Sequence, residues 1–467
     1  MNLLFWAKRA VKNMLNGKGL PETPGDLMIS EKMANAITGW MQAFYQQPAW
    51  LEHGVRVSNM PITITEYMAT LACNEIVMDA GPSARGRWIT EQIGRFFIPQ
   101  INNAVQLAGA GGRVIVKPYM EGKNILCDIV PADRIYPTRM NGAGMTTAGF
   151  FTDFSVLHGR KVVRVEAFDL VPDGLRITNR AYYYGLDDNL AGEIPLADVS
   201  EWAGLEPEIL VSGVDRPLFA EIKMPFANTI DETSKLPISL YARAMDTICE
   251  LDRIYSEFLH EIHSGKRKRI VDRDAIRPDK SGCGVPFRDQ VTDLYLTLDI
   301  DGTNMKPFED YTPDMRVDEY QKALDIQCRM LESQTGFSQG TFNFDIRQGR
   351  MTATQVISDD RNTYNTIHAI QDRGIRQGLK DLIYCYDVYA TLYGLAPAGS
   401  VEQAVSFGDS IFEDTATEFA RQKMLVDAGY LKPEKLIGWY FGVDEAGAAA
   451  YMPRQRAGSP FGFDGES

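Results

Sequence analysis

Residues 335–356 read TGFSQGTFNFDIRQGRMTATQV and separate two long helical patterns. The stretch combines glycines, phenylalanines and arginines, namely Gly336, Gly340, Gly349, Phe337, Phe342, Phe344, Arg347 and Arg350. At about fifteen residues it is long for a helix–helix connection, and long connections tend to be functional. Such a loop could hold a phosphate, cap a core or contact a polymer, and its flanks must decide between these roles.

The pattern after the stretch predicts the longest helix of the chain, over about residues 352–393. Thr352 and Gln355 form a capping box, in which each side chain bonds the backbone of the other residue. Gly374 and Gly378 lie inside the helical pattern and predict a kink. A phosphate-binding loop is disfavoured, because a helix precedes the stretch and no G-x-x-x-x-G-K-[ST] motif is present.

Two helices are predicted before the stretch, over residues 237–264 and 316–335. Each combines an apolar stripe with an acidic face. The acidic residues are Asp246, Glu250, Glu257 and Glu261 on the first helix, and Asp318, Asp325 and Glu332, at intervals of seven, on the second. Between the helices, residues 265–315 have the turn signal Asp301-Gly302 and short apolar runs, so we expect a small β unit there.

The rest of the chain alternates in character. Residues 1–107 are expected to be mostly helical, and residues 109–220 to be β-rich, as a sandwich or a meander with turns at Glu121-Gly122 and Asp173-Gly174. From residue 410 the pattern is helical again, and residues 454–467 are typical of a disordered tail. The first fifteen residues fit an amphipathic helix, docked on its own protein or a neighbouring subunit rather than on a membrane surface. The fold class is therefore α+β.

Composition excludes several functions. The net charge of −14 disfavours a general nucleic-acid coat, because phosphate binding requires basic surface. The six cysteines form no C-x-x-C pair, which indicates reduced thiols and no disulfide framework. HEIH at 260–263 lacks the spacing of a zinc protease motif, and LDIDG at 298–302 lacks the glycine position and closing glutamate of a calcium loop. We therefore expect that the protein binds no metal and no cofactor and has no enzymatic activity.

The glycines of AGAGGRVIVKP at 108–118 are expected to form a turn into a hairpin, since a strand follows them.

Two segments resemble the portal proteins of tailed double-stranded DNA phages, the siphophage head–tail connector family. They are residues 235–276, KLPISLYARAMDTICELDRIYSEFLHEIHSGKRKRIVDRDAI, and residues 336–367, GFSQGTFNFDIRQGRMTATQVISDDRNTYNTI. The second matches the family pattern Gly-φ-Ser-x-Gly-Thr-φ-x-Phe, where φ is apolar, followed by Thr-Ala-Thr-Glu-Val. Gln355 replaces the glutamate of that pattern, which keeps the capping side chain and removes a charge.

The resemblance implies a phage portal fold with a β-rich wing, a two-helix stem bracketing a small β clip, a long kinked wing helix and a helical crown. Its parts would fall on this chain as follows: wing 1–236, first stem helix 237–264, clip 265–315, second stem helix 316–335, tunnel loop 336–351, wing helix and connection 352–409, crown 410–453 and tail 454–467. Phe342, Phe344, Arg347 and Arg350 would then contact DNA, with Gly336, Gly340 and Gly349 as hinges. The seven acidic residues would line the channel.

The implied function is that of a ring, typically dodecameric, at one vertex of the virion capsid. Its channel would serve genome packaging, DNA retention and ejection. Its implied partners are further copies of itself, double-stranded DNA, the large terminase, a head–tail adaptor protein, and a scaffold or major capsid protein, with no membrane. The basic run Lys266, Arg267, Lys268 and Arg269 would bind a partner, or else form a solvated strand face. A minor capsid or neck adaptor protein is the alternative, and a nucleotide-dependent motor comes third because the Walker lysine is missing.

Overall fold

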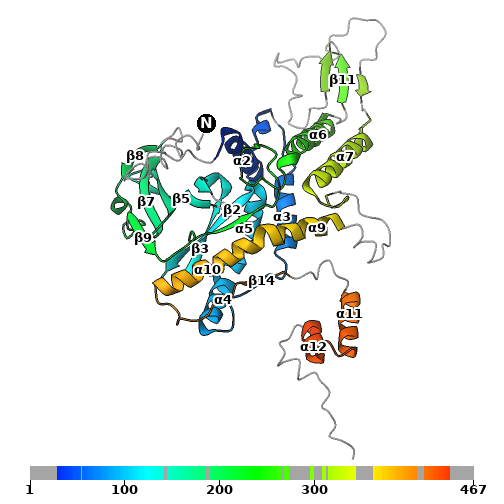
Figure 1. The fold of residues 1–467 in the computed structure, drawn as a ribbon. Helices are drawn as coiled ribbons and strands as arrows, with labels where there is room; N and C mark the ends of the chain where they lie inside the picture. The colour runs from blue at the N-terminus through cyan, green and yellow to red at the C-terminus, as the bar shows by residue number, and fades with distance from the viewer. Residues whose placement is uncertain are drawn as a thin grey trace, which may run out of the picture. The chain divides into compact units, whose positions relative to one another are not determined.

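The fold is known from a computed structural model, which describes residues 29–53, 55–140, 145–184, 190–264, 268–272, 295–298, 308–311, 314–342, 361–407 and 415–441. The chain divides into two compact units, the first made of Met1–Gln348 with Asp360–Phe407 and the second of Gly349–Asp359 with Gly408–Ser467. The first unit combines helices with antiparallel sheets, which confirms the α+β class (Figure 1).

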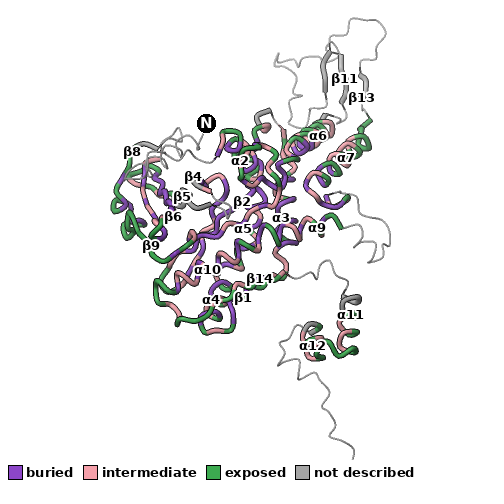
Figure 2. The backbone as a smooth tube through the Cα atoms, in the orientation of Figure 1, coloured by how far each residue is buried: buried purple, intermediate pink, exposed green. Residues whose placement is uncertain are grey.

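Helices dominate the described residues up to Gly111, as predicted. They are α2 (Glu31–Phe44), η1 (Ala49–His53), α3 (Met60–Ala72), α4 (Ala84–Phe96), η2 (Ile98–Gln100) and α5 (Ile101–Gly111). Serines begin two of them, because the Ser30 hydroxyl accepts the backbone N–H of Met33 at 3.1 Å and the Ser83 hydroxyl accepts that of Gly86 at 2.9 Å. Helix α5 is mostly buried (Figure 2), and its polar residues Asn102, Asn103 and Gln106 are the ones that keep exposed surface.

A three-stranded antiparallel sheet follows α5, in the order β10-β2-β3, formed by β2 (Arg113–Glu121), β3 (Asn124–Pro131) and β10 (Ala220–Lys223). The predicted hairpin around Gly122 is confirmed, with Gly122 at a φ of 63°. The glycines at 108–112 end α5 and turn into β2, as expected. Gly112 has a φ of 86°, and a Cβ there would lie 2.7 Å from the Pro237 carbonyl oxygen, so no larger residue fits.

The larger sheet is a meander, which settles the choice left open above. Its strands are β4 (Ile135–Met140), β5 (Met145–Leu157), β6 (Arg160–Val171), β7 (Gly174–Tyr184), β8 (Leu190–Ile194) and β9 (Glu208–Ser212). The order is β4-β5-β6-β7-β8, and β9 also pairs with β7. The short turns η3 (Ala132–Arg134) and η4 (Leu196–Asp198) connect these strands to their neighbours in the chain.

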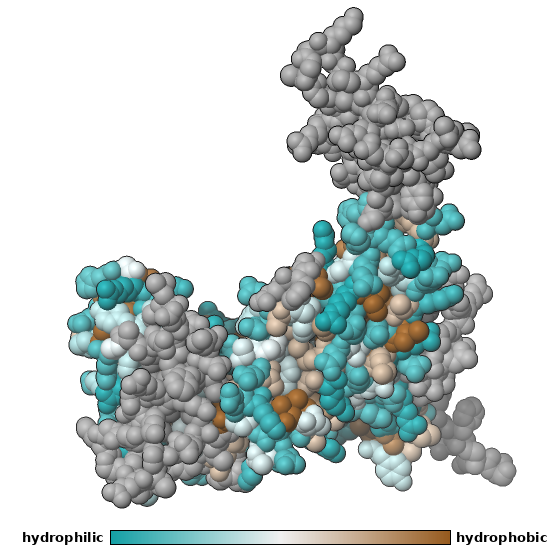
Figure 3. All heavy atoms as spheres, turned by 90° about the horizontal axis from the view of Figure 1, so that it is seen from above, coloured by the Kyte–Doolittle hydropathy of each residue, from teal (hydrophilic) through white to brown (hydrophobic). Residues whose placement is uncertain are grey.

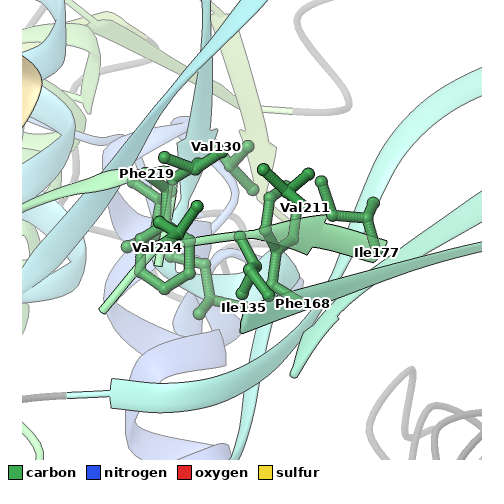
Figure 4. Close-up of a cluster of buried hydrophobic side chains, with 10 residues drawn as sticks. Val130, Ile135, Phe168, Ile177, Val211, Val214 and Phe219 are labelled. Atoms are coloured by element: carbon green, nitrogen blue, oxygen red, sulfur yellow. The ribbon is translucent and has the colours of Figure 1, made fainter. Parts of the chain in front are cut away.

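One apolar core joins the two sheets to the long C-terminal helix of this unit (Figure 4). Phe168 of β6 meets Phe219 edge-on, with ring centroids 5.6 Å apart. Around them lie Ile115, Val130, Ile135, Leu175, Ile177, Val211, Val214 and Leu218, with Tyr384, Val388 and Tyr389 packed against the cluster. The β-rich region is therefore one packed body with that helix.

The predicted helix, β unit and helix are present, with one corrected boundary. They are α6 (Met245–Ser264), β11 (Lys268–Asp272), β12 (Tyr295–Leu298), β13 (Phe308–Tyr311) and α7 (Val317–Thr335), and the strand order is β12-β11-β13. Helix α6 begins at Met245, after η5 (Ala242–Ala244), and not at Pro237. The earlier residues are held by α5 instead, because Leu240 N–H and the Ser239 hydroxyl both donate to the Gly109 carbonyl, at 2.9 and 3.0 Å.

The long helix is described from Arg361 as α9 (Arg361–Ile370), one π turn η7 (Gln371–Ile375) and α10 (Arg376–Leu392). The predicted interruption at Gly374 is thus a π turn. A Cβ at Gly374 would lie 2.3 Å from the Lys223 carbonyl oxygen, and one at Gly378 would lie 2.5 Å from that of Glu221. Both glycines therefore allow the helix to press against the backbone of β10.

After α10, strand β14 (Ala404–Ser406) pairs with β1 (Val77–Asp79) in a two-stranded antiparallel sheet. The second unit contains α11 (Thr415–Asp427) and α12 (Pro433–Phe441), whose rings Phe419 and Tyr440 lie 5.2 Å apart. The predicted helical character after residue 410 is confirmed for these two helices. The predicted amphipathic N-terminal helix and the predicted tail at 454–467 lie outside the described residues.

Candidate nucleic-acid interface

Helix α7 ends in a tight turn at the start of the stretch that opened the sequence analysis. Gly336 adopts a φ of 82°, and its N–H and that of Phe337 both donate to the Glu332 carbonyl at 2.9 Å. A Cβ at Gly336 would lie 2.8 Å from the Thr366 hydroxyl. The glycine is therefore required both by its backbone angle and by the close approach of α9.

The Glu332 carboxylate lies under this turn and is fully buried. Its Oε2 accepts the backbone N–H of Gly340 at 2.8 Å, and its Oε1 accepts that of Phe342 at 2.7 Å. Charge-assisted bonds of this kind are stronger than neutral ones and compensate for burying the carboxylate. The prediction that Glu332 lines a channel is wrong, because its side chain has no exposed surface.

Three aromatic rings pack against one another at the same turn. Phe337, Phe342 and Tyr67 of α3 meet edge-on in all three pairs, at centroid distances of 5.5 to 5.8 Å. Phe337 is 2% exposed and Phe342 is 7% exposed. The prediction that Phe342 contacts DNA is therefore wrong, since the ring is used in the packing of the turn against α3.

Helix α9 holds the turn through reciprocal hydrogen bonds. Ser338 N–H donates to the Thr363 hydroxyl at 3.0 Å, and Thr363 N–H donates to the Ser338 hydroxyl at 3.2 Å. The Thr366 hydroxyl donates to the Gly336 carbonyl at 2.7 Å. These bonds argue against hinges at Gly336 and Gly340. We call residues 332–342 with Thr363, Thr366 and Tyr67 the corner.

The remaining loop predictions cannot be compared with the structure. Phe344, Arg347, Gly349, Arg350, Thr352 and Gln355 lie outside the described residues, as do Lys266 and Arg267. Lys268 and Arg269 lie on β11, where only the backbone is described. The structure thus describes the base of the predicted tunnel loop and the helices that lead to it.

Contacts along the full length of α6 and α7 fix how these antiparallel helices pair. The Thr247 hydroxyl donates to the Gln334 side chain at 2.8 Å, and farther along the rings of Phe258 and Tyr320 lie 5.6 Å apart. At the start of α7, Arg316 donates to both carboxylate oxygens of Glu261, from Nε at 3.2 Å and from Nη2 at 2.6 Å. These side-chain bonds and the backbone N–H of Arg316 lower the pKa of Glu261 to about 2.

Glu261 is therefore charged but already neutralised by Arg316, which makes it a poor channel-lining group. Four other predicted acids are exposed, namely Asp246, Glu250, Glu257 and Asp318, and Asp325 is half-buried. Glu250 also accepts a bond from Arg253 at 2.5 Å on the helix surface. Five of the seven acids that were predicted to line a channel therefore lie on accessible surface.

Sequence reasoning missed an acid on the inner side of α6. Asp252 is 2% exposed and accepts bonds from the indole N–H of Trp50 at 2.9 Å and from Ser58, from its N–H at 2.7 Å and its hydroxyl at 2.6 Å. It thereby fastens α6 to residues 50–58. Its position off the face shared by Asp246, Glu250 and Glu257 was the available signal.

Sequence reasoning also missed the outer face of α7. Ile326 is 63% exposed and Met330 is 54% exposed, and both lie on the same helical side as the exposed Lys322 and Arg329. Apolar patches also interrupt the hydrophilic surface in the view of Figure 3. The spacing 322, 326, 329, 330 was visible in the sequence, but the predicted apolar stripe of this helix used other positions.

Among the described residues no group of His, Cys, Asp and Glu is placed to hold a metal ion. Within the same residues, no helix is both long enough and apolar enough to span a membrane.

No family model matches the sequence, and no curated protein matches it. The structure is similar to those of solved chains, among them the following two. A chain from the neck of a native GTA particle, computed with C12 symmetry, has 10% identity and a TM-score of 0.42, with 94% of this chain and 98% of that chain covered. A chain from the neck of an empty GTA particle, computed with C6 symmetry, has 10% identity and a TM-score of 0.43 over the same shares. The functional argument therefore rests on the residues of this chain.

Proposed function

We propose that this protein is a phage portal protein, a ring of identical subunits at one capsid vertex whose central channel admits, retains and releases double-stranded DNA. The observation that carries the proposal is the helix pair α6–α7. It brackets a small sheet, presents acids on accessible surface, and ends in a corner that leads into a glycine- and arginine-bearing segment. This order of elements is the one that the resemblance to portal proteins implies.

The physics of a DNA channel fits the charges on this pair. Asp246, Glu250, Glu257, Asp318 and Asp325 are the candidates for the channel wall. Like charges repel phosphates without specific contacts, so DNA would pass along such a wall without sticking to it. Arg347 and Arg350 would contact phosphates weakly and reversibly, because isolated arginines contribute only non-specific, salt-dependent binding.

The remaining assignments follow from the portal model. The region 265–315 would be the clip that meets the large terminase during packaging and the head–tail adaptor afterwards, with Lys266, Arg267, Lys268 and Arg269 as its contact residues. Residues 1–236 with the long helix would form the wing, and residues 410–453 the crown inside the capsid. Scaffold or major capsid protein would surround the ring. As a portal, the subunit would have no catalytic role.

Electron microscopy of the purified full-length protein tests the proposal. We expect rings of about twelve subunits with a central hole, since heterologous contacts that close generate rings. Monomers at high concentration, or closed assemblies without a hole, would contradict the portal function and favour a minor capsid or neck adaptor protein. ATP hydrolysis by the protein alone would favour the motor.

The channel wall has its own test in a packaging assay. Neutralising Asp246, Asp318 and Asp325 together as Asn should leave rings intact and slow DNA passage, because the wall would repel phosphate less. Asp372→Asn, an exposed acid on the π turn of the long helix, serves as the control. Unchanged packaging by the triple variant would remove these acids from the channel.

A further inference from the structure

The exposed faces of α6 and α7 carry charges of opposite sign at matching positions. The outer face of α6 carries Glu250 and Glu257 and no exposed large hydrophobic residue. The outer face of α7 carries Lys322 and Arg329, with Ile326 and Met330 between and beside them, and the acids Asp318 and Asp325 one turn before each cation. Within the described residues, neither Lys322 nor Arg329 forms an ion pair. An exposed apolar patch flanked by two cations favours a partner surface that is acidic and can cover methyl groups.

The spacing of the charges matches as well as their sign. Glu250 and Glu257 are seven residues apart on one helix, and Lys322 and Arg329 are seven residues apart on the other. Seven residues make two turns, so each pair is separated by about 10.5 Å along its helix axis. Two antiparallel helices could thus join both pairs at once, Glu250 with Arg329 and Glu257 with Lys322.

The heights of these residues along the helix pair also agree. Within one chain, Thr247 lies opposite Gln334 and Phe258 lies opposite Tyr320. Between these contacts, Glu250 is level with about Arg329, and Glu257 with about Lys322, along the antiparallel pair. In a ring whose axis runs along the helices, equivalent residues of neighbouring copies are at the same height. The two charge pairs therefore meet between copies without any axial shift, which is the condition for a closed ring instead of an open helix.

Resting on the proposed ring, we infer that the outer face of α6 in one copy binds the outer face of α7 in the next copy. Glu250 pairs with Arg329 of the neighbour, and Glu257 pairs with its Lys322. Ile326 faces Arg253, whose methylene groups can cover an apolar side chain while its charge stays in water. Arg253 already contacts Glu250 on the helix surface, a pair of the exposed kind that contributes little by itself.

The interface divides the acids of the proposed channel. Glu250 and Glu257 become subunit contacts. Asp246 shares their side of α6, and Asp318 and Asp325 lie one turn before Lys322 and Arg329 on α7, so these three acids lie at the border between the contact and the channel wall. The contact is heterologous, because α6 and α7 are different surfaces, so every copy uses one face toward each neighbour.

Charge reversal in the full-length protein tests the interface. The variant Glu250→Lys/Glu257→Lys and the variant Lys322→Glu/Arg329→Glu each place like charges on both sides of the contact. We expect the concentration needed for ring assembly, measured by mass photometry, to rise about a hundredfold or more in each, since each charge pair contributes about tenfold or more to affinity. Glu91→Lys/Glu201→Lys makes the same charge change at exposed sites on other elements and should assemble as the wild type does.

Mixing the two reversed variants gives the decisive result. The reversed α6 of one variant then faces the reversed α7 of the other, and the unchanged faces also match. An equimolar mixture should form rings in which the variants alternate, although neither assembles alone, and this recovery shows that both variants fold. Wild-type-like assembly by either variant alone, or no recovery on mixing, would overturn the inference and leave the ring proposal standing. A wild type that never forms rings would overturn both.

Discussion

The C-terminal end of α7 and the outer face of the same helix contrast in how far their side chains are buried. At its C-terminal end the corner is sealed, with a buried carboxylate bonded to two backbone N–H groups and three rings packed edge to edge. Along its outer face, Lys322, Ile326, Arg329 and Met330 are exposed. The acids that repeat at seven-residue intervals show the same contrast, since Asp318 is exposed, Asp325 half-buried and Glu332 fully buried. A shared period therefore does not imply a shared role.

The largest difference is expected between two apolar truncations. Phe337→Ala removes a ring that is 2% exposed and should lower the free energy of unfolding by about 3–5 kcal/mol. Ile326→Ala, at 63% exposure, should change it by less than about 0.5 kcal/mol in the unassembled protein. Denaturant unfolding of dilute protein measures both. Equal effects would mean that the corner is not a packed core.

A smaller difference in stability is expected between substitutions of two acidic residues of α7, Glu332 and Asp325. Glu332→Gln removes the charge that the N–H groups of Gly340 and Phe342 bond, and should cost about 2–3 kcal/mol. Asp325→Asn on the same helix is the matched control and should stay near the wild type. The same unfolding assay applies, and a neutral Glu332→Gln variant would show that the carboxylate does not hold the turn.

Glycine substitution distinguishes a fixed turn from a hinge at the corner. Gly340 has a φ of 85°, so Gly340→Ala should destabilise by about 1–2 kcal/mol. Gly39→Ala in α2, where a new Cβ meets nothing within 4 Å, should instead stabilise by up to about 1 kcal/mol. If Gly340→Ala were as stable as the wild type, the turn would not require its left-handed backbone and a hinge role would return.

The smallest effect is expected at the Glu261–Arg316 pair. The pKa of Glu261 lies at about 2, below its ordinary 4.5, so the charged form favours the folded state. The stability difference between wild type and Glu261→Gln should be full above about pH 4.5 and decline as the pH falls through about 2. Unfolding measured across that pH range checks the sign. A difference that grows on acidification would contradict the pairing.

The sequence predicted the order of elements well because periodicity reports which face of an element is buried. The α6, β unit, α7 order, the hairpin at Gly122 and the interruption at Gly374 were all visible in local patterns. The start of α6 was misplaced, because residues 237–241 have an apolar pattern for contact with α5 rather than for a helix. Only the tertiary structure distinguishes those two uses of apolar residues.

The site was harder to predict than the fold. The sequence placed Glu332 and Phe342 at the channel. An acid at a seven-residue interval and a phenylalanine in a glycine-rich stretch give no sign in the sequence that their side chains are buried. Their actual partners, two backbone N–H groups and Tyr67, depend on how the chain turns after Gly336. The exposed Ile326 and Met330 were missed for the opposite reason, because apolar residues on a helix are expected to face inward.

The reciprocal Ser338–Thr363 bonds join two backbone positions that are 25 residues apart in the chain. Because this junction is made by the corner itself, the intervening chain begins and ends at a common anchor whatever its length. The Thr366–Gly336 bond adds a third link between the same two elements. The register of α9 against α7 is therefore set by the corner and does not depend on the chain between Phe342 and Arg361.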